Sequence, residues 1–314
     1  MGYDPFVSKL NDGARRKMNI GITGATGFIG QNLYAALLEQ EDSLKINKLE
    51  TLDRRKYNLL ETRSLEQFVQ DKDIIFHFAG INRDNDPSSF ITVNTIGTLN
   101  LLDAIRHSSN SVVKLVFASS LQVCGFTSTP ERLSEGSPLK PTNIYGLSKE
   151  FAEKIVCSYS EIYGIHGLVF RFANVYGPRC KPNYNSVIST FINLALLEKP
   201  IVVQGGGNSS RDLIYVKDVV DACLRSLSYS NGFPEIFNVC TGLGTSVKKL
   251  VNDISLILKT HVHTVFTKDG AIDFLIGDPR KSKEKLGFVS KTSIVKGLAE
   301  TIDWFKEMKK NECK

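Results

Sequence analysis

Short, mostly apolar runs alternate along the chain with longer segments in which apolar residues return every three or four positions. The runs are typical of strands buried in a sheet, and the longer segments are typical of helices that cover one. The expected strands are 18–23, 48–53, 74–79, 112–118 and 167–172. The expected helices are 31–40, 64–70, 91–107 and one that opens at Tyr145. This repeated strand–helix order predicts an α/β fold, with a parallel sheet covered by helices on both faces.

The regular alternation is lost after Tyr176, where Pro, Gly and Asn become denser. We therefore expect a second, smaller domain in the C-terminal part of the chain. The segment 212–228 is expected to return to the main sheet, so the main domain would span 18–175 with about 212–239. The smaller domain would consist of 176–211 and 240–314, and 1–17 would be a disordered leader ahead of an alternative start at Met18.

Composition places the chain among ordinary globular proteins. Hydrophobic residues fill 42% of the 314 positions, too many for a disordered chain, and no apolar stretch approaches the roughly 18 residues of a membrane helix. The net charge of +6 (39 − 33) is concentrated at the two ends, since 1–17 and 304–314 each carry four basic and two acidic residues. The body has no basic stripe, so we expect neither a nucleic-acid nor a membrane partner.

The six cysteines are scattered, without a Cys-x-x-Cys pair or neighbouring histidine pairs. They are Cys124, Cys157, Cys180, Cys223, Cys240 and Cys313. Scattered thiols of this kind are typical of a reduced, cytoplasmic protein, and they predict neither a disulfide framework nor a metal site.

Three glycines, Gly24, Gly27 and Gly30, lie between the first expected strand and the first expected helix. Glycine permits a tight turn there and lets backbone N–H groups approach a pyrophosphate at the positive end of the helix. The same glycines would also suit a purely structural turn. Their place after the first strand favours a dinucleotide cofactor.

The second expected strand ends at Asp53, from which a carboxylate reaches the hydroxyls of an adenosine ribose. That position favours NAD(H). Arg54 and Arg55 follow at once, and a guanidinium there would hold the 2′-phosphate of NADP(H) or would simply be solvated. The sequence therefore leaves the choice between NAD(H) and NADP(H) open.

A serine, a tyrosine and a lysine form a candidate reaction centre. Ser119 and Ser120 close the buried strand at 112–118, and Tyr145 and Lys149 share one face at the start of a helix. A free phenol, with a pKa of about 10, is a poor acid–base catalyst at neutral pH, and a neighbouring ammonium brings that pKa toward the working range. The serine hydroxyl would orient a substrate oxygen.

The chain resembles the extended short-chain dehydrogenases/reductases, specifically the nucleotide-sugar epimerase/dehydratase family. The resemblance spans about 19–307 and rests on motifs at 23–30, 77–80, 94–98, 145–149, 171–179, 205–216 and 237–239. It implies a Rossmann-type doubly wound parallel sheet with a smaller C-terminal α/β domain for the substrate. A nucleotide-diphosphate sugar as substrate, a homodimer and a role in surface-polysaccharide synthesis are further implications.

The resemblance also implies roles for single residues. The catalytic residues would be Ser120, Tyr145 and Lys149. The cofactor would be held by Gly24, Gly27, Phe28, Ile29, Gly30, Asp53, Arg54, Asn58, Leu59, Ala79, Gly80, Asn94, Tyr145 and Lys149. The substrate would be held by Ser120, Asn174, Asn185 and Arg211. Arg211 fits independently, because a guanidinium in a loop is well shaped for bidentate phosphate binding.

Departures from the family pattern narrow the reaction. The family's 4,6-dehydratases carry an Asp–Glu pair after the catalytic hydroxyl residue, where this chain has Leu121 and Gln122. Neither side chain can exchange a proton, so dehydration is not expected. The short link from Asp53 to Asn58 is similar to that of 4-keto sugar reductases. We therefore expect reduction at C4 of a nucleotide-linked 4-keto-6-deoxyhexose. The alternatives are a UDP-hexose 4-epimerase and, more remotely, a non-catalytic NAD-binding scaffold.

Overall fold

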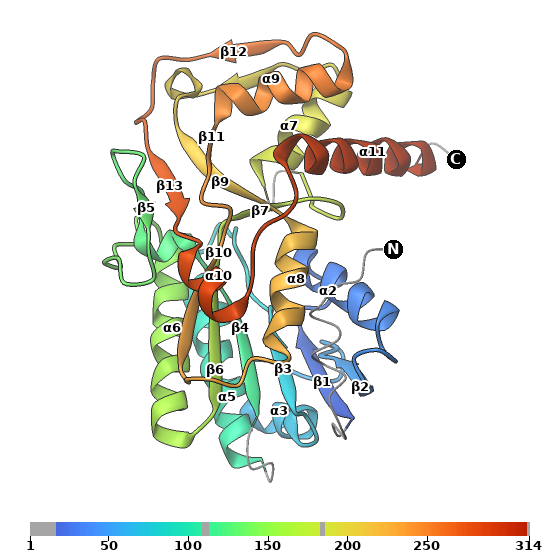
Figure 1. Cartoon of the computed structure of the whole chain (residues 1–314), viewed down its shortest axis with the longest axis vertical. Helices are drawn as coiled ribbons and strands as arrows, with labels where there is room; N and C mark the ends of the chain where they lie inside the picture. The colour runs from blue at the N-terminus through green and yellow to red at the C-terminus, as the bar shows by residue number, and fades with distance from the viewer. Residues whose placement is uncertain (1–16, 109–112, 183–185, 313–314) are drawn as a thin grey trace. The chain divides into compact units, whose positions relative to one another are not determined.

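The computed structural model describes residues 17–108, 113–182 and 186–312, which Figure 1 draws in colour. The chain divides into two compact units. The first contains the described residues up to Ala118, together with Phe151–Val169 and Cys223–Ile236. The second contains Ser119–Glu150, Phe170–Ala222 and the described residues from Phe237 onward. The expected leader over 1–17 lies outside the described residues, except for Lys17.

A six-stranded sheet has the strand order β10-β6-β4-β3-β1-β2. Its strands are β1 Met18–Thr23, β2 Ile46–Thr51, β3 Ile74–His77, β4 Lys114–Ser120, β6 His166–Phe172 and β10 Glu235–Val239. β1 pairs in parallel with both β2 and β3, and β3 pairs in parallel with β4. Because successive strands leave β1 in opposite directions, the sheet has the switch point of a doubly wound Rossmann-type fold. The expected fold class is confirmed.

Helices connect these strands and bury their apolar faces on the sheet. They are α2 Phe28–Glu39, α3 Thr62–Val69, α4 Pro87–Phe90, a π-helical turn Ile91–Ile96, α5 Gly97–His107 and α6 Ile144–Tyr163. In the first unit, α3, α5 and the C-terminal part of α6 share one apolar core with the strands. That core includes Leu65, Phe68, Leu101, Leu102, Ile105, Leu115, Phe117, Val156 and Val169.

Several element boundaries differ from the expected ones. β2 ends at Thr51, so Asp53 follows the strand instead of closing it. β4 extends to Ser120, so both serines belong to the strand. The helix expected over 91–107 starts earlier, at Pro87, because the Asp86 side chain accepts a hydrogen bond from the Ser88 N–H and Pro suits the first helical position.

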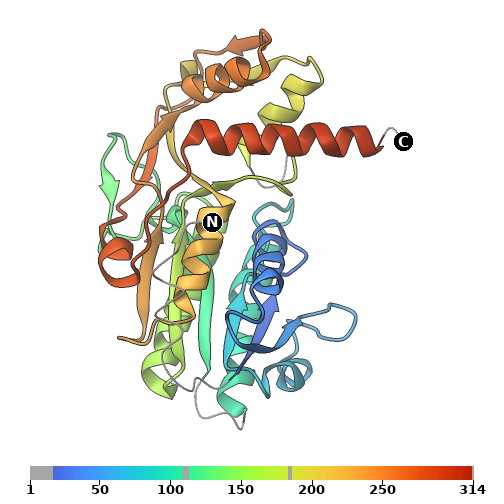
Figure 2. The same ribbon diagram turned by 45° about the vertical axis from the view of Figure 1, so that its right-hand side comes forward.

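The second unit is built on a five-stranded sheet in which β11, β9, β13 and β5 are neighbours and β7 pairs with β9. These strands are β5 Arg132–Leu133, β7 Asn174–Tyr176, β9 Ser210–Tyr215, β11 Gly244–Ser246 and β13 Phe274–Gly277. A separate parallel pair joins β8 Ile201–Val203 to β12 Thr264–Phe266. The remaining helices are α7 Val187–Leu196, α8 Val216–Ser226, α9 Val247–Leu258, α10 Arg280–Leu286 and α11 Ile294–Glu312, the long red helix in Figure 2.

The expected return of 212–228 to the main domain is wrong for its first part: Cys223–Ile236 belongs to the first unit, as expected, but 212–222 belongs to the second. The first residues of 212–228 belong to β9 of the five-stranded sheet, and α8 follows directly. The strand that joins the six-stranded sheet is β10, Glu235–Val239. The boundary of the second unit also differs from the expected one, because this unit includes Ser119–Glu150. A buried strand such as the end of β9 has the same apolar pattern in either sheet, so its sequence does not indicate which of the two sheets it joins.

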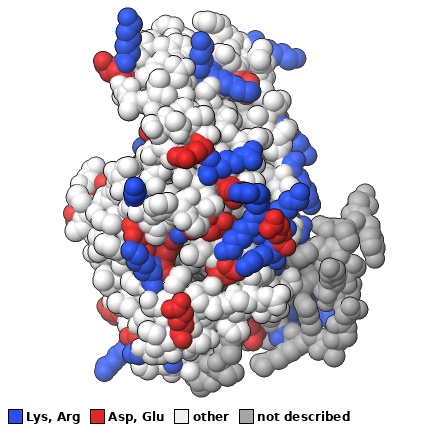
Figure 3. Space-filling view, turned by 60° about the vertical axis from the view of Figure 1, so that its left-hand side comes forward, with Lys and Arg blue, Asp and Glu red and all other residues white. Residues whose placement is uncertain are grey.

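In the described part of the chain, no helix combines the length and hydrophobicity needed to cross a bilayer. No group of three or more His, Cys, Asp or Glu side chains suited to a metal ion occurs within 17–108, 113–182 and 186–312. On the face drawn in Figure 3, Lys and Arg side chains are interspersed with Asp and Glu.

Candidate active site

Ser120 is the last residue of β4, at the carboxyl end of a buried parallel strand. A short 3₁₀ turn, Leu121–Cys124, begins immediately after it. The Ser120 hydroxyl accepts a hydrogen bond from the Gln122 N–H at 3.2 Å and so caps this turn. Strand pairing and the capped turn together hold a nearly buried hydroxyl in one place.

Tyr145 and Lys149 lie four residues apart in the first turns of α6, which places them on one face of the helix. Asn143 precedes the helix, and its Oδ1 accepts a hydrogen bond from the Gly146 N–H at 2.8 Å, as an N-cap residue does. The Tyr145 hydroxyl is hydrogen-bonded to the Ser120 side chain. The second unit therefore brings Ser120 and Tyr145 into contact, with Lys149 buried one helical turn further on.

The environment of the Tyr145 phenol favours its neutral form. Burial raises the pKa of Tyr145 to about 12, and the hydrogen bond from Ser120 acts in the opposite direction. An ammonium close to a phenol stabilises the phenolate, which is how a lysine one turn away lowers the pKa of a buried tyrosine. The arrangement suits a hydroxyl that exchanges a proton with a substrate oxygen.

A second contact joins the two segments that carry Ser120 and Tyr145. The Asn143 Nδ2 donates a hydrogen bond to Oε1 of Gln122 at 2.9 Å. The backbones also approach closely, because a Cβ on Gly146 would lie 2.7 Å from the Gln122 carbonyl oxygen. Sequence reasoning missed this contact. Its available signal was Asn143, a residue type that often caps a helix, two positions before Tyr145.

The glycine loop of the first unit has a conformation that depends on glycine. Gly24 has φ +73°, and a Cβ there would lie 2.5 Å from the Ala79 backbone nitrogen. A Cβ on Gly30 would overlap the Gly24 carbonyl oxygen. Gly27 is the N-cap of the 12-residue helix α2, which has no side-chain cap and no acidic residue in its first turn. A close backbone cradle at an uncapped helix start fits a pyrophosphate, so the loop residues fit a dinucleotide.

A chain of hydrogen bonds fixes the segment that follows β3. Thr98 Oγ1 donates to the Asn94 carbonyl at 2.6 Å and is 2.9 Å from His77 Nε2. His77 Nε2 therefore carries the proton, and His77 Nδ1 accepts from Thr23 Oγ1 at 2.7 Å. Thr23 Oγ1 in turn accepts from the Ala79 N–H at 3.1 Å.

Asn94 is a structural clamp for the same segment. It is fully buried, and its side chain exchanges two hydrogen bonds of 2.9 Å with the backbone N–H and C=O of Ile81. Next to it, the buried Oδ1 of Asn82 has no hydrogen-bond partner among the described residues. Ala79 and Gly80, two of the expected cofactor residues, are thus held in a segment that is fixed at both ends.

Asp53 is paired with Arg55. Its carboxylate accepts hydrogen bonds from Arg55 Nη2 at 2.7 Å and from the Arg55 backbone N–H at 2.9 Å. The guanidinium lowers the pKa of Asp53 to about 2, so the carboxylate is charged at neutral pH. Arg54 is exposed beside this pair.

Asn58 and Leu59 lie in the turn before α3. The Asn58 side chain donates to Glu61 at 2.8 Å and accepts from the Leu60 N–H at 3.0 Å, so it holds its own turn. A Cβ on Gly97 would lie 2.7 Å from Leu59, which shows that this leucine packs tightly on α5.

The expected substrate residues have three different positions. Asn174 is the first residue of β7. Arg211 is in β9 and not in a loop as expected, because the segment around it pairs with β11 and β13. Asn185 lies outside the described residues.

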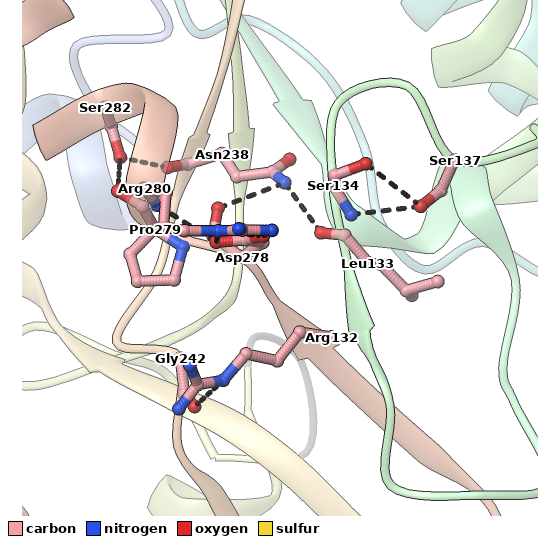
Figure 4. A network of polar contacts seen from close by, with 10 residues as sticks. All are labelled: Arg132, Leu133, Ser134, Ser137, Asn238, Gly242, Asp278, Pro279, Arg280 and Ser282. Carbon is pink, nitrogen blue, oxygen red and sulfur yellow. Dashed lines mark hydrogen bonds and ion pairs between the residues drawn. The ribbon is translucent and has the colours of Figure 1, made fainter. Parts of the chain in front are cut away.

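A polar network in the second unit was not expected from the sequence. The Asn238 Nδ2 donates to the Leu133 carbonyl at 2.8 Å, and the Asn238 carbonyl accepts from Ser282 at 2.8 Å. Arg132 donates to the Gly242 carbonyl at 3.0 Å (Figure 4). These bonds tie β5, β10 and α10 together, which explains why a buried Asn stands in the motif 237–239.

The sequence pattern of the NAD dependent epimerase/dehydratase family matches residues 20–240, which include the glycine loop, Ser120, Tyr145 and Lys149. The chain belongs to this family. The family assignment agrees with the resemblance inferred from the motifs.

Individual relatives of the family cover nearly the whole chain. A putative UDP-glucose 4-epimerase of Methanocaldococcus jannaschii is 30% identical over 303 residues, 91% of this chain and 97% of the relative. The human dTDP-D-glucose 4,6-dehydratase is 30% identical over 320 residues, 91% of this chain and 89% of the relative. The crystal structure of UDP-glucose 4-epimerase from Thermotoga maritima with UDP-glucose has a TM-score of 0.82 and 27% identity, covering 93% and 99% of the two chains.

Proposed function

We propose that this member of the family is a 4-epimerase of a UDP-linked hexose and that it uses NAD. The observation that carries the proposal is the hydrogen-bonded pair of Ser120 and Tyr145, with Lys149 one turn along the same helix. The similarity to the Thermotoga maritima UDP-glucose 4-epimerase and to the putative UDP-glucose 4-epimerase of Methanocaldococcus jannaschii supports the same reaction. The expected 4-keto reductase has no such specific support from the relatives.

Dehydration is disfavoured, although a dTDP-D-glucose 4,6-dehydratase is among the relatives. Elimination of water across C5 and C6 requires an acid and a base beside the sugar. The turn after Ser120 offers the alkyl side chain of Leu121 and the amide of Gln122. The Gln122 side chain is held in place, because its amide oxygen accepts a hydrogen bond from Asn143. An amide also has no titratable proton, so Gln122 cannot act as an acid or a base.

The glycine loop Gly24–Gly30, the clamped segment at Ala79 and Asp53 would hold the cofactor. NAD, when bound, takes up the hydride from C4 of the sugar and returns it. The charged Asp53 would accept hydrogen bonds from the ribose hydroxyls and repel a 2′-phosphate, which favours NAD over NADP. Arg55 pairs with Asp53 and holds its carboxylate ionised.

Tyr145 is proposed to act as base and then as acid on the same oxygen. Its phenolate oxygen accepts the proton of the sugar 4-OH as C4 is oxidised, and the resulting hydroxyl donates that proton back as C4 is reduced. Ser120 donates a hydrogen bond to the sugar O4 and keeps it next to the phenol. Lys149 stabilises the phenolate that these steps require. No additional acid or base is needed, because the proton that leaves O4 is the one that returns.

The short link between Asp53 and Asn58 favours a second candidate, the reduction of a nucleotide-linked 4-keto-6-deoxyhexose. It would use Ser120, Tyr145 and Lys149 in the reducing direction only. The two candidates differ in their use of cofactor: a reductase consumes one reduced nicotinamide for each product, and an epimerase consumes none.

The test is to incubate the full chain with NAD and UDP-glucose or UDP-N-acetylglucosamine and to follow the C4 epimers by NMR. We expect interconversion without net change in nicotinamide absorbance. Tyr145→Phe should abolish it, whereas Tyr159→Phe, on the same helix but bonded to Asp103, should retain it. No interconversion, together with stoichiometric oxidation of NADH or NADPH by a 4-keto-6-deoxy nucleotide sugar, would overturn the proposal in favour of the reductase.

A further inference from the structure

Arg211 is held by one acidic residue that is distant in the sequence. Its Nη2 lies 2.7 Å from Oδ1 of Asp273, and its Nη1 donates to the Asp273 carbonyl oxygen at 2.9 Å. Nη1 also donates to the Ser210 carbonyl at 3.0 Å. The guanidinium carbon lies 4.5 Å from the centre of the Phe126 ring. Both side chains of the ion pair are largely buried, with 21% and 29% of their surface exposed.

The backbone explains why Asp273 is in reach of Arg211. β9 and β13 are parallel neighbours, with Leu275 opposite Arg211, so the residue just before β13 lies beside the start of β9. The Ser210 N–H donates to the Asp273 carbonyl at 3.0 Å, and the Asp273 N–H donates to Ser209 Oγ at 3.2 Å. Asp273 is therefore a fixed point, whereas a long arginine side chain has many rotamers to choose from.

The contacts occupy one part of the guanidinium. Arginine has five N–H donors in a planar fork, and bidentate anion binding uses two parallel donors on one edge. Asp273 takes a donor from each terminal nitrogen, and the Ser210 carbonyl takes the other donor of Nη1. Within the described part of the chain, Nε donates to no group, so the edge formed by Nε and Nη2 keeps two parallel donors.

We propose that Asp273 is a positioning residue that fixes the Arg211 guanidinium by its terminal nitrogens and presents the Nε–Nη2 edge to the diphosphate of the substrate. The inference rests on the proposed function, because it takes a nucleotide-diphosphate sugar as the ligand. Phe126 limits rotation of the guanidinium plane by stacking on it. If the Asp273 carboxylate only repelled the diphosphate, its removal would strengthen binding of the ligand. If it positions Arg211, its removal weakens binding.

The experiment compares the affinity of UDP and of uridine for the full chain loaded with NAD, by calorimetry. Asp273→Ala should weaken UDP binding roughly five- to tenfold, an effect of about the size of one hydrogen bond, because the Arg211 guanidinium is no longer held in place. Uridine binding should be unchanged. Asp273→Asn retains an acceptor for Nη2 and should bind UDP within about twofold of the unaltered protein. Asp269→Ala, which removes an exposed carboxylate from the same segment, is the matched control for charge alone.

A double-variant cycle isolates the pair. In an Arg211→Lys background, Asp273→Ala should have no further effect on UDP affinity, because lysine has no fork to orient. Unchanged or tighter UDP binding by Asp273→Ala would overturn the inference, and so would equal weakening in the Ala and Asn variants. If the unaltered protein does not bind UDP, the proposed function fails and the inference falls with it. If the unaltered protein binds UDP and Asp273→Ala binds it equally well, the inference is overturned and the proposed function stands.

Discussion

The side-chain amide of Asn143 donates a hydrogen bond to Oε1 of Gln122 at 2.9 Å. Gln122 follows the strand that ends in Ser120, and Asn143 caps α6, which begins at Ile144 and carries Tyr145. The contact therefore links the two segments whose hydroxyls meet in the candidate active site. It fixes their separation without touching either hydroxyl.

Asn143→Ser separates the two tasks of Asn143. Serine is an equally good N-cap, but it is too short to reach Gln122. We expect kcat to fall roughly five- to tenfold, as for the loss of a hydrogen bond worth about 1 kcal/mol, with the melting temperature nearly unchanged. Steady-state kinetics and thermal unfolding measure the two effects. Asn143→Ala removes the cap as well and should lower the melting temperature; a Ser variant with normal kcat would show that the link has no role in catalysis.

Lys149→Met should move the activity to higher pH. Loss of solvent around the half-buried Tyr145 raises the pKa of its phenol to about 12, and the nearby ammonium is the group proposed to bring it down. At neutral pH we expect kcat to fall about 10²- to 10⁴-fold, with a rise toward alkaline pH that the unaltered protein does not show. Lys154→Met, on the exposed side of α6, is the control for charge. An unshifted pH profile in the Lys149 variant would contradict the role given to Lys149.

The same phenol affects stability at alkaline pH. In the Lys149→Met variant no ammonium opposes the effect of burial, which raises the pKa of Tyr145 to about 12, so the folded variant keeps a proton that the unfolded chain loses near pH 10. The contribution of the protonated phenol to the unfolding free energy is fully present below about pH 10 and is lost as the pH rises toward 12. The difference in unfolding free energy between Lys149→Met and the double variant Lys149→Met/Tyr145→Phe should therefore shrink or change sign over that range. Urea unfolding at several pH values measures it, and a constant difference would contradict the burial of a neutral phenol.

Thr98→Val removes the hydroxyl that accepts the hydrogen bond from the His77 Nε2–H and that anchors the chain of bonds leading to Ala79. A buried imidazole N–H would be left without a partner, so we expect a loss of about 1–3 kcal/mol in unfolding free energy. Weaker NAD binding should accompany it, because the Ala79 segment loses its support. Thr92→Val, exposed on the same helical run, should change stability by less than about 0.5 kcal/mol. Equal effects in the two variants would refute the chain of bonds.

The local parts of the fold and site could be predicted from the sequence. The glycine loop, the strand that carries Ser120 and the helix face shared by Tyr145 and Lys149 each depend on residues within a few positions of one another. Short-range spacing determines such features, because a helix repeats every 3.6 residues and a strand every two.

The contacts that orient the site could not be predicted in that way. Gln122 and Asn143 are 21 residues apart, and Arg211 and Asp273 are 62 apart. Their pairing depends on strand order, and the sequence led to the wrong sheet for the first residues of 212–228, which lie in β9. An apolar run is buried in either sheet, so its pattern carries no information about which neighbour it takes.

Asp212, the neighbour of Arg211 in β9, is expected to act as a structural hydrogen-bond acceptor. Its buried carboxylate accepts hydrogen bonds from Thr241, Gly242 and Gly277, and burial raises the pKa of Asp212 while these donors oppose the rise. Asp212→Asn would turn an amide N–H toward backbone donors, and we expect a loss of about 2–3 kcal/mol in urea unfolding. Asp303→Asn, exposed on α11, should be neutral. Similar losses for both would show that the carboxylate is not a structural acceptor.

The fate of the hydrogen at C4 tests the central claim most directly. UDP-glucose labelled with deuterium at C4 is incubated with the protein and NAD in ordinary water, and the product is examined by NMR and mass spectrometry. If C4 is oxidised and reduced on the enzyme, with Tyr145 and Ser120 handling only the proton of O4, UDP-galactose forms with the deuterium still at C4. Loss of the label to solvent, or no C4 epimer from either UDP-glucose or UDP-N-acetylglucosamine with the folded protein, would contradict the account.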